Sequence, residues 1–296
     1  MALAWHPIAV KIGGWQHSAV QALLLAYGRG RRMMLQVGDI TTPAVRMGKG
    51  PPLVVVHGFG DSHVSFVPLA VGLARHFEVI AFDLPGFGAA SPVPTLQTTV
   101  RQQAAFLAEV LDQLGLGSVH LLGHSMGGSI VARFGHDFGA RVQSLTLLSP
   151  AGPKGLCEPL QSAWRAGEAP LAPKNFAEFE VVQQLCVQKP MYIPGPMLRY
   201  AGEVWCQRQP EMAAHFGTLM APPPGDEVPA DLRPPPAPVT VVWGERELLV
   251  HPDNLAFYIE RLAPIVVHLP GVGHAGHLEA PGEVVRAVVA NAQRAN

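Results

Sequence analysis

A serine at position 125 lies between two glycines in the stretch LLGHSMGGSIVARFG (121–135). The residues before it are apolar as in a strand, and those after it follow a helical pattern. Glycine is used where the backbone must strain or approach another segment closely. The pattern G-x-S-x-G between a strand and a helix is typical of a nucleophile elbow, a turn that exposes one serine hydroxyl. Ser125 is therefore the candidate nucleophile, with Gly123 and Gly127 as the elbow glycines; a glycine-rich turn with an idle serine is the alternative.

A serine nucleophile needs a base that accepts its proton. The chain has 13 histidines, so the candidate base is selected by its position relative to the predicted strands. His274 follows the last predicted strand, in PGVGHAGHLEAP (270–281), and active sites of parallel sheets lie at the carboxyl ends of strands. We predict that His274 is the base. His277 is its competitor, with a structural role beside Glu279 as the expected one.

The base needs a carboxylate that orients it, between the serine and the histidine in chain order. The stretch VVWGERELLVHP (241–252) follows a predicted strand and offers Glu245 and Glu247. Either carboxylate fits the requirement, and either could instead be a solvated loop charge.

The reaction also needs N–H groups that stabilise a developing oxyanion. The residue after the nucleophile, Met126, supplies one such N–H. The glycine-rich turn HGFG (57–60) follows an early apolar run, LVVV, and places the N–H of Phe59 at the same edge of the sheet. We predict an oxyanion hole made by Phe59 and Met126.

Elements that position these residues can be read from the pattern of apolar runs. Six short runs read as buried strands, at 53–57, 77–83, 119–124, 144–149, 239–244 and 266–271. Helical spacing marks 98–115 and 281–292. Strands that are apolar on both faces and alternate with helices predict a doubly wound, mostly parallel α/β sheet.

The alternation stops between the fourth and fifth runs. Residues 151–236 are rich in proline, aromatics and methionine, and we expect a helical insertion that caps the sheet and ends in a proline-rich linker. The predicted organisation is an N-terminal extension with a helix and the first strands (1–50), a core (51–150 and 237–296) and a cap (151–236). Part of the cap's apolar set is expected to line an acyl pocket, while others pack the cap onto the sheet; packing alone is the alternative for the whole set. The set is Trp164, Phe176, Phe179, Met191, Tyr192, Met197, Trp205, Phe216 and Met220.

The N-terminal segment predicts an amphipathic helix. Val20, Leu23, Leu24 and Tyr27 share helical spacing, and Arg29, Arg31 and Arg32 follow them. A signal peptide has its positive charge before the apolar stretch, so this segment does not resemble one. We expect the helix to dock on the core; weak contact with a membrane surface is the alternative.

Composition and charge argue against nucleic-acid binding. Charged residues make up 15% of the chain and its net charge is −1, which is not the pattern of a nucleic-acid-binding protein. The three cysteines, Cys157, Cys186 and Cys206, lack metal-ligand spacing and predict free thiols in a reducing, cytoplasmic compartment. The sequence predicts no metal and no cofactor, and it does not determine the oligomeric state.

The sequence resembles the α/β-hydrolase fold family, in the branch of capped serine esterases and lipases. Five stretches carry the resemblance: HGFG (57–60), FDLPGFG (82–88), GHSMGG (123–128), WGERE (243–247) and GVGHAGHLEAP (271–281). In this family the acid stands four residues after the tryptophan of the W-G motif, which implies Glu247. The usual acid is Asp, so this chain departs from the family pattern at that position.

The resemblance implies an ester hydrolase acting on small hydrophobic substrates. Dehalogenases and epoxide hydrolases of this fold use an aspartate where Ser125 stands, which disfavours both. Carbon–carbon bond hydrolases share the serine triad, but many carry a tryptophan after the catalytic histidine, where this chain has Ala275. A non-catalytic ligand-binding homologue is the remaining alternative.

Overall fold

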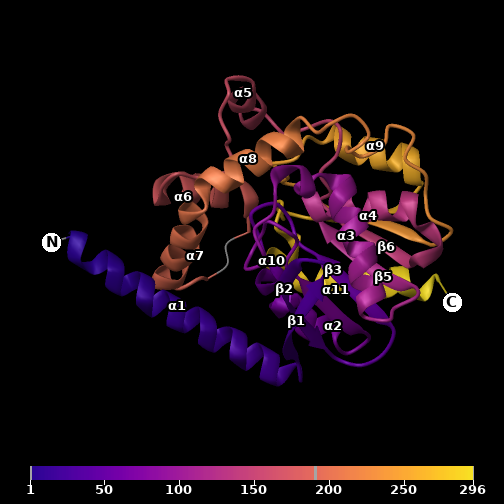
Figure 1. Cartoon of the computed structure of the whole chain (residues 1–296), viewed down its shortest axis with the longest axis horizontal. Coiled ribbons are helices and arrows are strands. Elements are labelled where there is room, and N and C mark those ends of the chain that lie inside the picture. The colour runs from indigo at the N-terminus through magenta and orange to yellow at the C-terminus, as the bar shows by residue number, and fades with distance from the viewer. Residues whose placement is uncertain (1, 190–191, 296) are drawn as a thin grey trace.

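A computed structural model describes residues 2–189 and 192–295 of the chain. It contains one eight-stranded sheet with helices on both faces (Figure 1). The strands are β1 (Arg31–Val37), β2 (Ile40–Met47), β3 (Pro52–Val56), β4 (Glu78–Phe82), β5 (Val119–His124), β6 (Val142–Leu148), β7 (Val239–Gly244) and β8 (Ile265–Leu269). Their order across the sheet is β1-β2-β4-β3-β5-β6-β7-β8.

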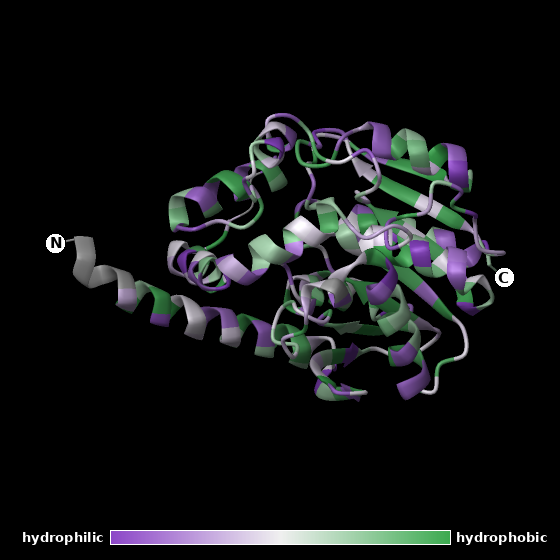
Figure 2. Ribbon diagram, turned by 45° about the horizontal axis from the view of Figure 1, so that its top comes forward, coloured by the Kyte–Doolittle hydropathy of each residue, from purple (hydrophilic) through white to green (hydrophobic). Residues whose placement is uncertain are grey.

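Strands β3 to β8 are parallel, and the N-terminal pair β1 and β2 extends the sheet in antiparallel register. All residues of β5 and β7 are buried, as expected for strands covered on both faces. The strands run between the helical layers as mostly hydrophobic ribbons (Figure 2). The predicted fold class and its six core strands are confirmed.

Two hydrophobic cores lie on opposite faces of the sheet. One contains side chains of α3 (Val100–Gln113), α4 (Met126–Asp137) and α9 (Asp253–Leu262), and the other contains side chains of α2 (Val67–Leu73) and α11 (Pro281–Gln293). Helix α3 begins where the Thr99 side chain accepts a hydrogen bond from the N–H of Gln102. Its buried Ala104, Leu107 and Leu111 follow the helical spacing read from the sequence.

Four helices lie between β6 and β7, and we call this segment the cap. They are α5 (Leu160–Arg165), α6 (Phe176–Cys186), α7 (Gly195–Gln207) and α8 (Gln209–Met220). The short helix α10 (Gly276–Glu279) precedes α11, and the 3-10 turns are His63–Phe66, Thr95–Thr98 and Gly139–Arg141. The proline-rich stretch after α8 has no regular element, because proline lacks the N–H that helices and sheets require. The exact domain boundaries stay a prediction.

Helix α1 (Ala2–Tyr27) runs along one side of the molecule and its N-terminal end projects away from the body (Figure 1). It packs against α7, where the His17 ring lies 5.6 Å from that of Tyr200, and the Gln21 amide donates a hydrogen bond to the Val64 carbonyl. Hydrophobic and hydrophilic residues alternate along it (Figure 2). No helix within the described residues is long and apolar enough to cross a membrane.

The face of α1 that docks is not the one read from the sequence. Three of the four residues of the predicted stripe face outward: Val20 is 42% exposed, and Leu23 and Tyr27 are each 71% exposed. Gly13, Gln21 and Leu25 are buried instead. Gly13 lies against Pro196 of the cap, whereas Gln21 and Leu25 contact the core, so the helix docks on both, and the expectation that the apolar stripe makes the contact is wrong.

Candidate active site

The elbow is built by backbone strain at Ser125. This residue joins β5 to α4 with φ 55° and ψ −119°, a conformation that residues with a side chain rarely adopt. A Cβ on Gly123 would lie 2.2 Å from the carbonyl oxygen of Gly127, and one on Gly127 would lie 2.3 Å from the carbonyl oxygen of Val56. The turn therefore closes only with glycine at both positions, which explains the spacing around the serine.

His274 and Glu247 meet at the carboxyl ends of neighbouring strands. The Nδ1 atom of His274 lies 2.7 Å from Oε2 of Glu247, and both side chains are almost fully buried. The other carboxylate oxygen of Glu247 accepts the N–H groups of Leu249 and Val250. Glu245 is exposed to solvent. Of the two glutamates that the sequence offered, Glu247 is the one bonded to the histidine.

Burial and hydrogen bonding shift the pKa of the Glu247 carboxyl in opposite directions. Burial alone raises its pKa, but the neighbouring His274 and the two backbone N–H donors outweigh burial and hold the pKa below its ordinary value. The group is therefore a carboxylate at neutral pH. A carboxylate in this position orients the imidazole and stabilises its protonated form.

The loop that carries His274 is held by a second glutamate. The carboxylate of Glu279 accepts the N–H of Gly273 at 3.1 Å and the N–H of Gln188 at 2.9 Å, which ties the loop to the end of α6. Glu279 does not pair with His277, so that expectation is wrong. The His277 ring instead stacks on Phe66 with centroids 4.4 Å apart.

The turn 57–60 lies against the elbow. A Cβ on Gly58 would be 3.2 Å from the Cβ of Ser125, so the backbone of this turn passes directly beside the nucleophile. Phe59 and Met126 both line a cavity that contains Ser125. The two residues whose N–H groups are expected to form an oxyanion hole thus line the same cavity as the serine.

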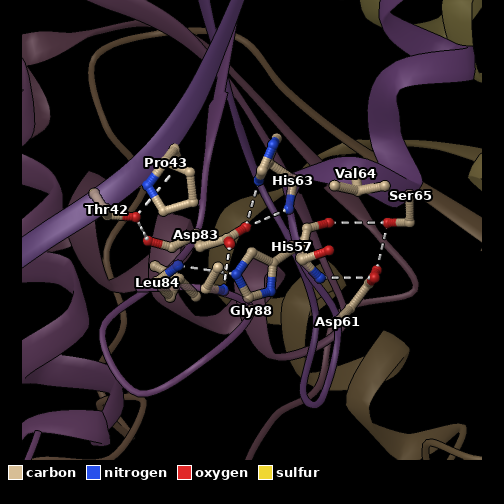
Figure 3. Close-up of polar contacts among 12 residues, drawn as sticks. Thr42, Pro43, His57, Asp61, His63, Val64, Ser65, Asp83, Leu84 and Gly88 are labelled. Carbon is tan, nitrogen blue, oxygen red and sulfur yellow. Dashed lines mark hydrogen bonds and ion pairs between the residues drawn. The ribbon is translucent and has the colours of Figure 1, made fainter. Parts of the chain in front are cut away.

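Reading the sequence did not predict a polar network that His57, His63 and Asp83 form beside this turn (Figure 3). The carboxylate of Asp83 accepts the N–H of His63 at 2.7 Å, the His63 ring Nδ1–H at 2.6 Å and the N–H of Ala89 at 2.7 Å. The His57 ring accepts the N–H of Leu84 at 2.9 Å, which leaves its Nδ1–H to donate to the Gly58 carbonyl. The bonds of His57 fix the start of the turn, and those of Asp83 fix the segment that follows it at His63. The signal was present, because Asp83 belongs to the stretch FDLPGFG.

Two cavities meet at Ser125. The larger, of about 540 Å³, is lined mostly by apolar side chains of the cap and core, including Phe216, Met220 and Val228. The smaller, of about 130 Å³, contains His274, Asp61 and His124. Ser125, Phe59, Leu171 and Leu249 line both. Ser125 therefore faces two cavities, and the smaller one holds the titratable side chains.

Few of the cap residues expected in an acyl pocket line these cavities. Phe216 and Met220 line the larger one, and Trp205 lines the smaller. Tyr192 is 92% exposed and lines neither cavity, while Met191 lies outside the described residues. The remaining residues pack inside the cap or lie on it: Trp164, Phe176, Phe179 and Met197. Pro222, Pro224 and Val228 of the proline-rich segment line the larger cavity, so this segment is part of its wall.

A model of the alpha/beta hydrolase family matches residues 53–287. The chain belongs to this family. It is 38% identical over 117 residues to the dihydrolipoyllysine-residue acetyltransferase component of the acetoin cleaving system of Cupriavidus necator, a match that spans 39% of this chain and 31% of that relative. Lipase 1 of Psychrobacter immobilis is 28% identical over 239 residues, which cover 79% of this chain and 74% of the lipase.

A solved structure with high similarity is that of a membrane phospholipase A, described as a bacterial virulence factor. Its TM-score is 0.86 at 25% identity, over 95% of this chain and 93% of that one. The predicted membership of the alpha/beta hydrolases, with lipases among the relatives, is confirmed.

Burial sets the charge of other groups beside the cavities of this alpha/beta hydrolase. It raises the pKa of the Cys186 thiol to about 12 and lowers the pKa of His277 to about 3. Burial likewise holds the pKa of His124 well below its ordinary value. At neutral pH these groups are uncharged, and the charged group bonded to the His274 ring is Glu247.

Proposed function

We propose that this protein is a serine hydrolase that cleaves carboxylic esters with short to medium hydrophobic acyl groups through an acyl-enzyme intermediate. The observation that carries the proposal is the buried 2.7 Å contact between Glu247 and His274, in a chain whose His274 and Ser125 line one cavity. The family and its lipase relatives support the same reaction class.

Each residue has a defined role in the proposed reaction. The hydroxyl oxygen of Ser125 attacks the ester carbonyl while His274 takes its proton, and Glu247 stabilises the resulting imidazolium. The N–H groups of Phe59 and Met126 donate to the oxyanion of the tetrahedral intermediate. His274 then returns the proton to the leaving alcohol, and a water activated by His274 hydrolyses the acyl-serine.

The two cavities support an orientation for the ester. The acyl group fits the larger, apolar cavity, because hydrophobic pockets with a few polar groups at the reacting end suit such ligands. The alcohol then leaves through the smaller cavity, where His274 can protonate it. We expect a small-molecule hydrophobic ester as substrate and no role for nucleic acid.

Two alternatives are weighed against this proposal. The bond between Glu247 and His274 supports an active triad, although the family usually has Asp, and so argues against a purely ligand-binding homologue. Carbon–carbon bond hydrolysis uses the same triad; Ala275, where many such enzymes have tryptophan, favours the ester reaction.

The decisive experiment is ester hydrolysis by the purified protein. We expect turnover of p-nitrophenyl butyrate, loss of turnover after treatment with a serine-reactive phosphonate, and loss by several orders of magnitude in Ser125→Ala. A folded wild-type protein with no turnover would contradict the proposal. Turnover of a 2-hydroxy-6-oxo-dienoate without turnover of any ester would favour the carbon–carbon alternative.

We further propose that α1 gives the enzyme weak contact with an anionic membrane surface. Ile8, Ile12, Trp15, Leu23 and Tyr27 recur at intervals that place them on one side of the helix, and all are exposed, Trp15 by 74%. An apolar face with an interfacial tryptophan is typical of helices that lie in a bilayer surface.

The charge of the N-terminal segment matches such a surface. Residues 1–38 contain no Asp or Glu, and they carry Lys11, Arg29, Arg31 and Arg32, all exposed. Basic residues beside an apolar face add electrostatic attraction to anionic lipids. The similar phospholipase is described as a membrane enzyme. Since Cys157, Cys186 and Cys206 are free thiols, we place this contact in a reducing, cytoplasmic compartment.

A further inference from the structure

Three side chains with metal-ligating atoms converge at the small cavity. Asp61 comes from the turn after β3, His124 ends β5, and His277 lies in α10. One ligand atom of each lies within 4.8 Å of those of the other two. All three residues line the cavity that contains Ser125 and His274.

Ring nitrogens in this cluster are buried without a partner. Among the described residues, Nδ1 of His124 and both ring nitrogens of His277 make no hydrogen bond. His124 is 6% exposed and His277 only 3% exposed. Buried polar atoms are nearly always hydrogen-bonded, so three unpartnered nitrogens at one place require an explanation.

The ring of His124 is held as the ring of a metal ligand is. Nε2 of His124 lies 3.0 Å from the carbonyl oxygen of His274, which only accepts, so this nitrogen carries the proton and Nδ1 keeps a free lone pair. Ligating histidines commonly donate their other N–H to a backbone carbonyl in this way. The stack on Phe66 fixes the ring of His277.

Asp61 completes the donor set. Its two carboxylate oxygens accept the Ser62 N–H at 2.8 Å and the Ser65 hydroxyl at 2.6 Å (Figure 3). Each oxygen retains a further lone pair. These bonds orient the carboxylate, as hydrogen bonds around a ligating carboxylate do in metal sites.

We propose that Asp61, His124 and His277 bind a divalent transition-metal ion, Zn²⁺ by the chemistry of the donors, and that the bound ion inhibits the enzyme. Two imidazoles and a carboxylate are typical Zn²⁺ ligands, whereas Mg²⁺ and Ca²⁺ prefer oxygen. Zn²⁺ bonds of about 2.1 Å require the three atoms to draw together, and Asp61, partly exposed on a turn, is the ligand that shifts to do so.

Inhibition follows from the position of the ion and rests on the proposed function. The ring centroids of His124 and His274 are 4.7 Å apart. A cation bound to His124 repels the positive charge that His274 must carry during the proposed reaction. It also occupies part of the space from which the alcohol would leave.

Binding is tested without reference to activity. The chelator-treated protein is titrated with Zn²⁺ by calorimetry and with Co²⁺ by visible absorption. We expect one tight site per chain, and a Kd raised at least tenfold in Asp61→Asn and in His277→Gln. His268→Gln removes an exposed histidine of β8 and is the matched control, with the Kd unchanged. No tight site in the wild type, or equal Kd values in wild type and Asp61→Asn, would overturn the proposal.

Activity provides the second readout. Zn²⁺ should inhibit p-nitrophenyl butyrate hydrolysis by the wild type at the concentrations that saturate the calorimetric site, and Asp61→Asn should require at least tenfold more. A protein that binds Zn²⁺ but hydrolyses no ester would contradict the proposed function and leave the metal site standing. Hydrolysis that saturating Zn²⁺ does not reduce would refute the inhibitory role.

Discussion

Glu247 holds His274 through a 2.7 Å contact between Oε2 and Nδ1, with both side chains shielded from solvent. Two residues earlier, Glu245 is exposed. The same residue type in the same loop thus occupies two different environments, which allows the role of the carboxylate to be tested with a matched pair.

Glu247→Gln should lower kcat for p-nitrophenyl butyrate by roughly two orders of magnitude or more, because the amide lacks the charge that stabilises the imidazolium and can favour the wrong tautomer. Glu245→Gln, the matched control, should stay within a factor of about two, as expected for an exposed charge. Equal losses in the two variants, or a larger loss in Glu245→Gln, would assign the acid to Glu245.

Strain at the elbow predicts an unusual order of stabilities. Ser125 adopts φ 55° and ψ −119°, a conformation that is strained for serine and alanine but not for glycine. Ser125→Gly should therefore be at least as stable as Ser125→Ala in urea denaturation, and both should be inactive. Ser129, inside α4, is the control: there Gly should be about 1 kcal/mol less stable than Ala. If Ser125→Gly is clearly less stable than Ser125→Ala, glycine does not relieve backbone strain at residue 125, and the prediction is wrong.

Asp83→Asn should destabilise the fold and slow catalysis, because an amide cannot accept the three N–H bonds that the carboxylate receives. We expect a loss of about 1–3 kcal/mol at pH 7, with Asp137→Asn as a surface control below about 1 kcal/mol. Turnover should fall because the segment after the turn 57–60 loses its anchor at His63.

The loss of stability in Asp83→Asn should depend on pH. Burial alone raises the pKa of Asp83, but its bonds to His63 and Ala89 hold the pKa below the ordinary value of 3.8. The charged group is therefore favoured in the folded state, and its stabilisation is present above pH 3.8 and lost as pH falls through the lower folded pKa. The difference in unfolding free energy between wild type and Asp83→Asn should shrink in this acid range; a constant difference would contradict the assignment.

Acyl-chain preference should follow the larger cavity. Each methylene buried there should add up to about 0.8 kcal/mol of binding, so kcat/KM for p-nitrophenyl esters should rise from acetyl to butyryl or hexanoyl. Val228→Phe narrows this cavity and should lower kcat/KM for hexanoate more than for acetate. Val181→Phe, on the exposed side of α6, should leave the profile unchanged. A profile that is flat or falls from acetate would exclude an acyl pocket here.

Membrane contact should depend on the exposed face of α1. Replacing both Trp15 and Leu23 with serine should reduce sedimentation with phosphatidylglycerol vesicles, because it removes apolar area from the helix face. Replacing Tyr192 and Val181, two exposed apolar residues of the cap, with serine is the control and should change nothing. Binding that is equal on phosphatidylcholine vesicles would contradict the role assigned to the basic residues.

The sequence by itself identified the features that depend on residues adjacent in the chain. The apolar runs, the spacing of α3 and the glycines around Ser125 are local patterns, because strand, helix and turn are selected by backbone preferences over a few residues. Position after a strand pointed to His274 and to the loop that carries Glu245 and Glu247, because parallel strands bring their carboxyl ends to one edge. The choice of Glu247 over Glu245 came from the family resemblance, and the structure bonds Glu247 to His274.

Contacts between segments that are distant in the sequence were decided only by the tertiary structure. The outward face of α1 follows from its fit to α7, and its hydrophobic pattern alone gave the wrong face. The proline-rich segment lines the larger cavity because of the path that the chain takes from α8 to β7. Asp61, His124 and His277 lie far apart in the chain and meet only through sheet packing, so no local spacing could reveal them.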